Sequence, residues 1–587
     1  MRLVYSVVTA MAALMIGLAA LKTGAVDGPS HRYHVDFEHG SDANDGMTPR
    51  TAWKHAPGDV TASGRPGQTR LIPGDHVMFA SGVVYRGAIR VSASGTPQKP
   101  IVFEADAGGS ATIDGSDPIL FAGCLSQAEC GGLPSWRNLI RARLPQAMAD
   151  GASLFADQGL LRIASDPDPV DPFYADETSD MTTVDSGKLA QGEAPLPTSL
   201  QAPTERLKIA LWVRPNLVIE RAVINTANGK AHFDPTGINF YTDRPSRIAF
   251  LNHPAALNES GEYVTLADSS VIVALPPQAR NIGLATGRGG IELKHASNIV
   301  IRNLSFAHMA SGGSLFGGVA IFSNIRGNSG LEIDHCDFRD MHLPSGQGPI
   351  TLRGMSSLKI HDNRVDSIGG GSGIRISGPG ANMMIARNYI RKVGRTAIML
   401  MLVDDAVVEN NFITDIRGVH GNGLSAYLDN HRIKMLRNIV IGAKQPVTFK
   451  GGGPALAAAG PNDLVFDGNL LVGTPDSLGS LISWGASTRG VQITNNVLLG
   501  GRFGLRLNST DAELNISNNS GVPPMNLPST PASWHLGSNQ WSSSPSTDTA
   551  SALAGAQDRA GICSRLGTGG GLDRAQQRAL GCPGSAH

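Results

Sequence analysis

The sequence predicts an all-β protein built mainly as a parallel β-solenoid, and three observations support this. Glycine occurs 71 times while aromatic residues make up only 5% of the chain, which is typical of a turn-rich β protein. Short strands with alternating apolar residues recur about every 27 residues between positions 304 and 519. No helical periodicity interrupts this repeat, so each repeat is expected to be one coil of stacked strands.

Each repeat contains a strand that leads to a fixed anchor position. Apolar or small residues stand five and three positions before the anchor, so one face of the strand is buried. An asparagine at this position can bond backbone groups of its own and neighbouring coils, so a ladder of seven asparagines is expected. An earlier coil is expected around Ala222. The anchors are Leu304, Cys336, Asn363, Asn388, Asn411, Asn438, Asn469, Asn496 and Asn519.

A second strand lies between successive anchors, and its outward residues are unusual. Parallel stacking places them in columns along one face, which gathers positive charge in a chain of zero net charge. Because arginine makes bidentate pairs with carboxylates, we expect this face to bind an extended acidic polymer. A plain solvated strand face is the alternative. The outward residues are Glu292, Lys294, Thr351, Arg353, Arg375, Ser377, Met399, Met401, Ser425, Tyr427, Thr448, Lys450, Arg506 and Asn508.

The chain divides into five segments. Residues 1–25 are expected to be a signal peptide or an N-terminal anchor, since an apolar run follows one early arginine. Residues 31–115 are expected to form an N-terminal cap and the first coils. Residues 116–285 are interpreted as an inserted β-rich side domain that could wall one side of the groove. Residues 286–525 hold the regular coils, and 526–587 a Ser/Pro-rich linker with a cysteine-bearing end.

Charge and cysteine content limit the partners. Zero net charge provides no global field for nucleic acid, and a membrane is a partner only if the N-terminal segment stays uncleaved. Export would place a monomer outside the cell or in the periplasm, where disulfides are permitted. Proximity suggests the pairs Cys124–Cys130 and Cys563–Cys582, and leaves Cys336 as an inert core thiol. The cysteine spacing does not fit structural zinc.

Several segments outside the repeat resemble a known group of proteins. The stretch "YHVDFEHGSDANDGMTPRTAW" and the one that begins "GDHVMFASGVVYRG" resemble the opening of secreted right-handed parallel β-helix proteins that act on polysaccharides. "LFADQGLLRIASDPDP" and "NHPAALNESGEYVTLADSSVIVALPP" resemble two further segments of its large members. The resemblance covers residues 33 to about 525. It implies a right-handed β-helix of about ten or more coils with an inserted side domain.

The group includes pectate, alginate and chondroitin lyases, polygalacturonase-like hydrolases and mannuronan epimerases. The Asp-Pro-His-Asp signature of the periplasmic epimerases is absent from this sequence. A lyase of this fold needs cations on the uronate carboxylate, a base for the neighbouring C–H and an acid for the leaving oxygen. We expect Arg353 and Arg375 on the carboxylate, Lys450 or His420 as base, and Tyr427 as acid or stacking platform. Substrate contacts are expected from Lys294, Glu292, Asp429 and Arg506.

Two other functions remain open. A glycoside hydrolase needs two carboxyl groups across the scissile bond, and Glu292, Asp404, Asp405 and Asp429 are candidates. A non-catalytic glycan-binding solenoid would need only the cationic stripe. The sequence specifies no cofactor. Calcium is a possible one for such lyases, and the acidic turn at Asp42, Asn44 and Asp45 has oxygen ligands at close spacing.

Overall fold

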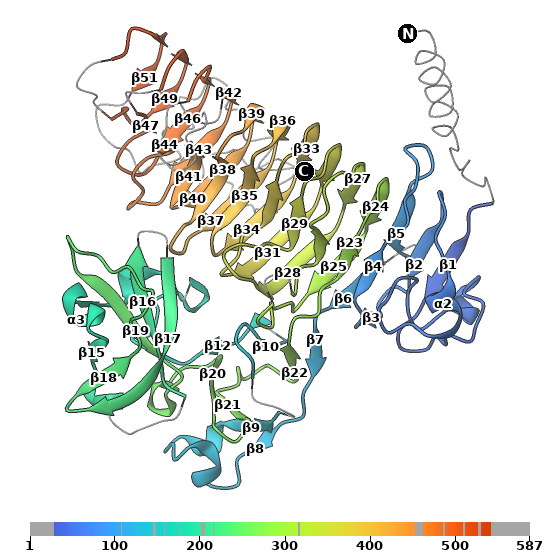
Figure 1. The fold of residues 1–587 in the computed structure, drawn as a ribbon, viewed down its shortest axis with the longest axis vertical. Coiled ribbons are helices and arrows are strands. Elements are labelled where there is room, and N and C mark those ends of the chain that lie inside the picture. Colours follow the sequence, from blue (N-terminus) through green and yellow to red (C-terminus); the bar gives the residue numbers. More distant parts are fainter. Residues whose placement is uncertain are drawn as a thin grey trace, which may run out of the picture.

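The computed structural model shows a long stack of parallel coils with a β-rich lobe beside it (Figure 1). It describes residues 29–541, apart from 107–108, 145–147, 158, 175, 201–205, 215–216, 315–316, 452–461, 485–487, 509–510 and 526–529. Within these residues, α-helix is limited to two short segments, α2 (Gly64–Gln68) and α3 (Ser186–Ala190). The predicted all-β parallel solenoid is confirmed.

Three parallel sheets form the solenoid, and each full coil passes through sheet A, sheet C and sheet B in that order. In the described part of the chain, sheet A consists of β1 (Arg32–Val35), β2 (His76–Phe79), β5 (Ile101–Ala105), β24 (Ile299–Arg302), β27 (Leu331–Asp334), β30 (Leu358–His361), β33 (Met383–Ala386), β36 (Asp404–Glu409), β39 (His431–Leu436), β42 (Asn462–Asp467), β45 (Gln492–Thr494), β48 (Leu514–Ser517) and β50 (Trp534–Leu536).

Sheet C contains the strands that directly follow the anchor positions. They are β3 (Val84–Tyr85), β6 (Ala111–Asp114), β25 (Leu304–Ala307), β28 (Asp337–His342), β31 (Arg364–Gly369), β34 (Tyr389–Val393), β37 (Phe412–Ile416), β40 (Ile439–Ala443), β43 (Leu470–Gly473), β46 (Val497–Leu499), β49 (Ser520–Gly521) and β51 (Gln540–Trp541). Sheet B consists of β4 (Ile89–Val91), β23 (Ile291–Leu293), β26 (Ile321–Ser323), β29 (Ile350–Arg353), β32 (Ile374–Ser377), β35 (Thr396–Met401), β38 (Asn422–Tyr427), β41 (Gln445–Lys450), β44 (Leu481–Trp484) and β47 (Leu505–Arg506).

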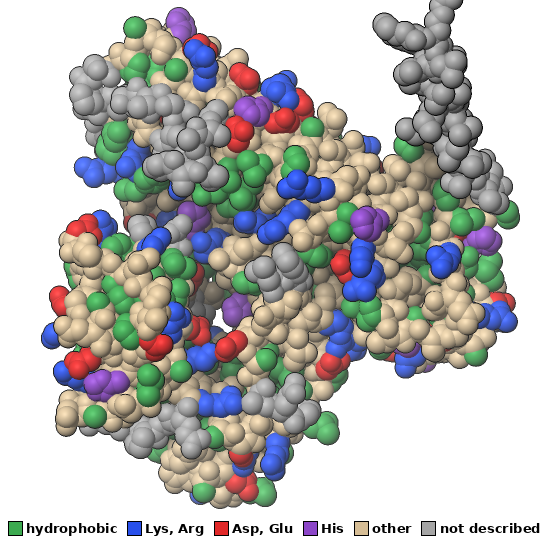
Figure 2. Space-filling model, viewed as in Figure 1, with side chains coloured by type: hydrophobic (Ala, Val, Ile, Leu, Met, Phe, Trp, Pro, Cys, Tyr) green, Lys and Arg blue, Asp and Glu red, His purple; other side chains and the backbone are tan. Residues whose placement is uncertain are grey.

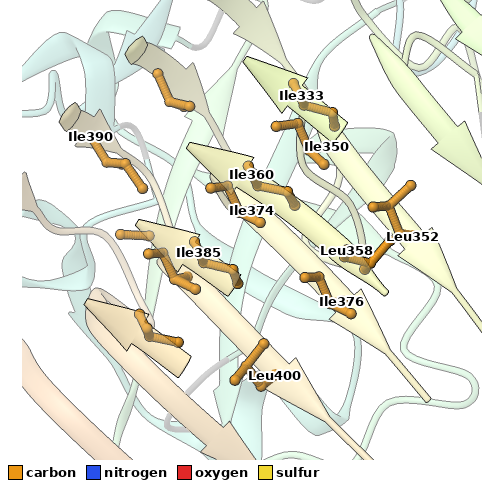
Figure 3. Close-up of a cluster of buried hydrophobic side chains, with 14 of the residues drawn as sticks. Ile333, Ile350, Leu352, Leu358, Ile360, Ile374, Ile376, Ile385, Ile390 and Leu400 are labelled. Atoms are coloured by element: carbon orange, nitrogen blue, oxygen red, sulfur yellow. The ribbon is translucent and has the colours of Figure 1, made fainter. Parts of the chain in front are cut away.

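The core of the solenoid is a continuous column of aliphatic side chains. Period-two alternation turns every second residue of sheets A and B inward, and these residues stack on their counterparts in the next coil (Figure 3). The inward residues predicted for the second strand of each coil, such as Ile374 and Ile376, are fully buried. Fully burying one such side chain contributes about 2 kcal/mol, so the stacked column accounts for much of the stability.

An asparagine ladder closes the bend between sheets A and C, and this prediction is also confirmed. From Asn388 onward the amide oxygen of each rung accepts the backbone N–H and the side-chain amide of the preceding anchor, as Asn411 Oδ1 does from Asn388 at 3.0 and 2.9 Å. Its own Nδ2 donates to the Ile385 carbonyl at 2.9 Å. The residue before each anchor has a positive φ, between 49° for His335 and 64° for Gly468, which makes the bend. The ladder extends one rung beyond the prediction, to Asn539.

Residues 116–285 leave the solenoid between β6 and β23 and fold into the lobe, drawn teal to green in Figure 1. Its strands are mostly antiparallel and enclose separate apolar clusters. They are β7 (Ser116–Pro118), β8 (Ala122–Gly123), β9 (Ile140–Arg143), β10 (Ser153–Ala156), β11 (Gly159–Leu160), β12 (Arg162–Ile163), β13 (Ser165–Asp166), β14 (Thr182–Val184), β15 (Glu193–Pro195), β16 (Lys208–Arg214), β17 (Leu217–Ala227), β18 (Lys230–Phe233), β19 (Ser246–Leu251), β20 (Glu262–Thr265), β21 (Ser270–Val273) and β22 (Ile282–Ala285).

Two details of the sequence prediction need correction. The expected coil around Ala222 is wrong, because β17 pairs antiparallel with β16 and β18 inside the lobe. Alternating apolar residues mark a half-buried strand of either kind, so the pattern alone does not distinguish a parallel coil from an antiparallel strand. The coils also continue past residue 525, since β50 pairs parallel with β48 and β51 with β49.

The cysteines follow the prediction where the structure describes them. Cys124 and Cys130 form a disulfide, and Cys336 is a buried free thiol. Its burial raises the pKa of this thiol to about 12. The proposed Cys563–Cys582 pair, the N-terminal export segment and the C-terminal linker beyond residue 541 lie outside the described residues. Among those that are described, we find no helix with the length and hydrophobicity needed to span a bilayer.

Candidate functional site

The outward residues of sheet B form two columns in register, as the alternation predicts. Adjacent strands pair Arg375 with Met399 and Tyr427 with Lys450. The first column runs Glu292, Phe322, Thr351, Arg375, Met399, Ser425, Thr448, Ile482 and Arg506. The second runs Arg353, Ser377, Met401, Tyr427, Lys450 and Trp484. Figure 2 shows Lys and Arg side chains gathered where the solenoid faces the lobe, beside a hollow in the surface.

Much of the first column is packed rather than open to solvent. Thr351, Ser425, Thr448 and Ile482 are all buried, and Met399 is only 8% exposed. Thr448 Oγ1 bonds Ser425 Oγ at 3.0 Å, which satisfies two of these polar groups internally. The accessible chemistry of the face therefore belongs to the charged and aromatic residues of the two columns and to the turns at their ends.

Arg375 is the most unusual of these residues. Its Nη1 lies 2.9 Å from Met399 Sδ and its Nη2 3.3 Å from Met401 Sδ, while its buried Nε has no hydrogen-bond partner. Across the described residues, no carboxylate lies within ion-pair distance of Arg375. Burial, with the nearby positive charges of Arg353 and Arg395, lowers the pKa of Arg375 to about 10. A half-buried cation that bonds only thioethers is costly, and a bound carboxylate would relieve that cost.

His420 and Tyr427 lie in the same cluster. Burial, together with the charges of Arg395 and Lys450, lowers the pKa of His420 to about 4, so its imidazole is neutral at pH 7. Lys450 Nζ lies 5.4 Å from the centre of the Tyr427 ring, a cation–π distance. The structure thus brings together Arg353, Arg375, His420, Tyr427 and Lys450.

The other predicted substrate contacts lie outside this cluster. Glu292 pairs with Arg90 at 2.8 Å and stands three rungs, or about 14 Å, from Arg375. Lys294 is exposed beyond the end of β23, and Asp429, beyond β38, pairs with His431 at 3.1 Å. Arg506 belongs to the first column but lies at its C-terminal end.

The hydrolase candidates Asp404 and Asp405 are not on this face at all. They begin β36 in sheet A, where both pair with Arg432, Asp405 at 2.6 Å and Asp404 at 3.5 Å. Two carboxylates held by one arginine on another sheet cannot flank a bond bound on sheet B. Of the four candidate acids, Asp404 and Asp405 therefore do not lie on the sheet B face.

Sequence reasoning missed an aromatic residue in the second column. Trp484 follows Lys450 in that column, its Nε1 donates to Gln445 Oε1 at 3.3 Å, and Arg506 Cζ lies 4.2 Å from its ring centre. The strand "LISW" obeys the same alternation as the others, so the parity rule would have found it. Tyr427 and Trp484 give this column two aromatic surfaces two rungs apart.

The lobe also contributes acids that the repeat could not reveal. Asp176 and Glu177 reach the solenoid from the lobe, and Glu177 pairs with Lys444 at 2.7 Å. Burial raises the pKa of Asp176 to about 6, and the opposing charge of Arg395 limits this rise. No local pattern in "FYADET" marks these residues, because their role depends on where the lobe packs.

The possible metal ligands are already occupied by other protein groups. Asp42 accepts from His55 Nδ1 at 2.7 Å, and Asp45 accepts from Thr51 Oγ1 at 2.6 Å, so this turn is satisfied internally. Elsewhere, Asp334, His361 and Asp362 have ligand atoms within 4.8 Å of one another on the sheet A side. Asp362, however, holds Arg387 through two bonds of 2.8 and 2.6 Å. Neither group lies at the sheet B cluster.

Comparison with known proteins agrees with this architecture. Residues 320–520 match the family model described as a right handed beta helix region. A solved structure named "Glycoside hydrolase" has 11% identity and a TM-score of 0.52, covering 94% of this chain and 100% of its own. XylC with xylose has 11% identity and a TM-score of 0.42 over 86% of each chain. Lacto-N-biosidase GH136 from Eubacterium ramulus has 11% identity and a TM-score of 0.37, over 87% of this chain and 67% of its own.

A search of curated proteins gives no match. At 11% identity, the similarity to the first of these structures shows the fold alone. The protein is a right-handed parallel β-helix with an inserted lobe, which confirms the predicted fold class.

Proposed function

We propose that the protein is an extracytoplasmic polysaccharide-active enzyme that cleaves an acidic, uronate-containing glycan by β-elimination on sheet B. The observation that carries the proposal is the environment of Arg375, a half-buried guanidinium whose hydrogen-bond partners among the described residues are two thioether sulfurs. Arginine pairs well with carboxylates, and a uronate supplies one on each acidic sugar. A neutral glycan would leave this cation uncompensated.

The residues of the cluster account for the steps of an elimination. Arg375, with Arg353 nearby, binds the carboxylate and stabilises the negative charge that develops when the adjacent C–H is deprotonated. His420, neutral above about pH 4, takes that proton. The released electron pair forms a C=C bond, the C–O bond of the glycosidic link breaks, and Tyr427 protonates the departing oxygen. Lys450 lies over the Tyr427 ring at a cation–π distance.

Hydrolysis is the second candidate, and the raised pKa of the Asp176 carboxyl group favours it. A carboxyl group with a pKa of about 6 beside a groove suits the general acid of a glycoside hydrolase. This mechanism requires a second carboxylate across the bond, for which Asp429 is the acid on the sheet B side.

One incubation distinguishes the candidates. Purified protein is mixed with polygalacturonate, alginate or a chondroitin, and the ultraviolet absorbance of unsaturated uronate ends is followed alongside reducing ends. Elimination produces both signals. Reducing ends without the ultraviolet signal would replace elimination by hydrolysis. Binding without either signal would make the protein a glycan-binding solenoid.

A further inference from the structure

The lobe contacts the solenoid near β28, where Ser153 Oγ bonds His342 Nδ1 at 2.8 Å, and again through residues 173–177, which we name the strap. Its described residues contact three successive coils at the corner between sheets C and B. Lys392 Nζ lies 4.8 Å from the Phe173 ring centre, and Tyr174 Oη donates to the Asp415 carbonyl at 2.6 Å. Glu177 pairs with Lys444 one coil further on. Lys392, Asp415 and Lys444 end or follow the strands β34, β37 and β40.

Asp176 is the strap residue that lies closest to the catalytic cluster. Its carboxylate lies against the 417–421 turn, and the backbone of Val419 and the charge of Arg395 both oppose the rise in its pKa that burial causes. Gly418 makes this approach possible, because a Cβ there would lie 3.0 Å from Asp176 Oδ1 and 2.4 Å from the Gly394 carbonyl oxygen. Gly418 also has a φ of 85°, which disfavours any side chain.

The turn that Asp176 holds is the one that carries His420. Val419 precedes His420 directly, and the N–H of Asn422 at the end of this turn donates to the Arg395 carbonyl at 2.8 Å. Asp176 therefore contacts the two coils that place Arg395 and His420 beside each other. A pocket of about 200 Å³ lies between the strap and the solenoid. Its lining includes Phe173, Asp176, Glu177, His342, Gly369 and Gly370.

We propose that Asp176 is a positioning residue, through which the inserted lobe holds the 417–421 turn and Arg395 in the geometry that the site requires. The inference rests on the proposed function only where its test measures activity. Asp176 itself need not touch substrate, because its carboxylate lies against the Gly418–Val419 backbone and interacts with the charge of Arg395. The site is thus completed by a segment more than 200 residues away in sequence.

Three variants of the full-length protein test this. Asp176→Ala removes both the acceptor and the charge, whereas Asp176→Asn keeps an acceptor oxygen and removes only the charge. Glu193→Gln is the matched control, since Glu193 is a lobe carboxylate that pairs with Lys230 at 2.6 Å away from the joint. Hydrogen exchange of the 417–421 amides and NMR titration of His420 are measured without substrate, and kcat and KM with it.

Asp176→Ala is expected to speed exchange of the turn about tenfold and to raise the pKa of His420 from about 4 toward its ordinary value. Its kcat should fall about tenfold or more while KM changes less than about threefold. Asp176→Asn should lie between Asp176→Ala and wild type, and Glu193→Gln should match wild type.

Unchanged exchange and an unchanged His420 titration in both Asp176 variants would overturn the positioning role, whatever the activity. Should the wild-type protein cleave no uronate polymer, the proposed function fails, while the exchange and titration results still decide the role of Asp176.

Discussion

Sheets A and B belong to the same coils, yet their cations differ in pairing beyond the first two strands of sheet B, where Arg90 pairs with Glu292. Along sheet A and its turns, cations pair with acids of the protein: Arg302 with Glu104 at 2.7 Å, Arg387 with Asp362 at 2.6 Å, and Arg437 with Glu409 at 2.5 Å. On sheet B, within the described residues, Arg375, Lys450 and Arg506 have no carboxylate at such distances.

This difference separates structural charge from functional charge. A paired surface charge contributes little and needs no ligand, whereas a half-buried cation without an acid raises the free energy of the empty protein. Charge that the fold leaves uncompensated is available to an acidic ligand. Composition alone could not show this, because the whole chain has zero net charge.

The largest effect should come from replacing Arg375. Arg375→Met removes the cation but keeps an unbranched side chain among Met399 and Met401. We expect turnover of a uronate polymer to fall by about 100- to 1,000-fold, since one stabilising donor to the developing charge is lost. Thermal stability should stay constant or rise by about 1 kcal/mol, because an uncompensated buried charge is removed.

The matched control for this experiment is Arg432→Met, on sheet A, where Asp405 already compensates the charge. It should leave turnover unchanged. Kinetic and calorimetric measurements on both variants check the contrast, and a loss of stability in Arg375→Met together with normal turnover would assign Arg375 to the scaffold.

The next effect is on pH dependence. The folded-state pKa of His420, about 4, lies below its ordinary value of 6.5. Between these values the unfolded chain binds a proton that the folded protein does not, so His420 makes stability fall as pH drops from about 6.5 to 4. The difference in unfolding free energy between wild type and His420→Gln should change by about 3 kcal/mol over this window.

Wild type must be compared with His420→Gln because Asp176 changes the pH dependence of the unfolding free energy in the opposite direction. Its raised pKa means that the folded state binds the extra proton between pH 3.8 and about 6, which favours folding as pH falls. Denaturant unfolding at several pH values gives the difference directly. Parallel curves for wild type and His420→Gln would show that His420 is not held in a desolvated site.

A smaller effect is expected at the far end of sheet B. Trp484→Ala removes an aromatic surface on which Arg506 stacks. Stacking of a sugar ring on such a surface should contribute about 1 kcal/mol to the binding free energy. We expect KM to rise about tenfold for long glycans, and to change little for short ones that occupy only the Arg375 end. Trp534→Ala, on the last strand of sheet A, is the control. Equal KM values for wild type and Trp484→Ala on long glycans would place the binding groove elsewhere.

The sequence alone was sufficient to predict strand register and side-chain direction in the repeating coils. Period-two alternation and the anchor asparagines predicted the register of sheet B, so the sequence alone places Arg375, Tyr427 and Lys450 on one face. Each coil contacts mainly its neighbours, and local pattern therefore determines position. Trp484 was within reach of the same rule.

The remainder depends on contacts between distant segments, which carry no local signal. The apolar alternation around Ala222 fits antiparallel and parallel strands equally well. The burial of Thr351 and Ser425 depends on packing around the column rather than on their own strands. Asp176 joins the site only because the lobe packs on the corner of β37 and β38, and the two segments are separated by most of the lobe and several coils.

The smallest effect should be seen on sheet A itself. Arg387 and Asp362 form a bidentate pair, with Arg387 half exposed and Asp362 about one quarter exposed. A double-mutant cycle with Arg387→Ala and Asp362→Ala should give a coupling of less than about 1 kcal/mol, decreasing with added salt, because water screens the pair. Turnover should not change in either single variant. A loss of turnover that accompanied such a weak coupling would mean that sheet A also faces the substrate, and the distinction between paired and uncompensated faces would no longer identify the site.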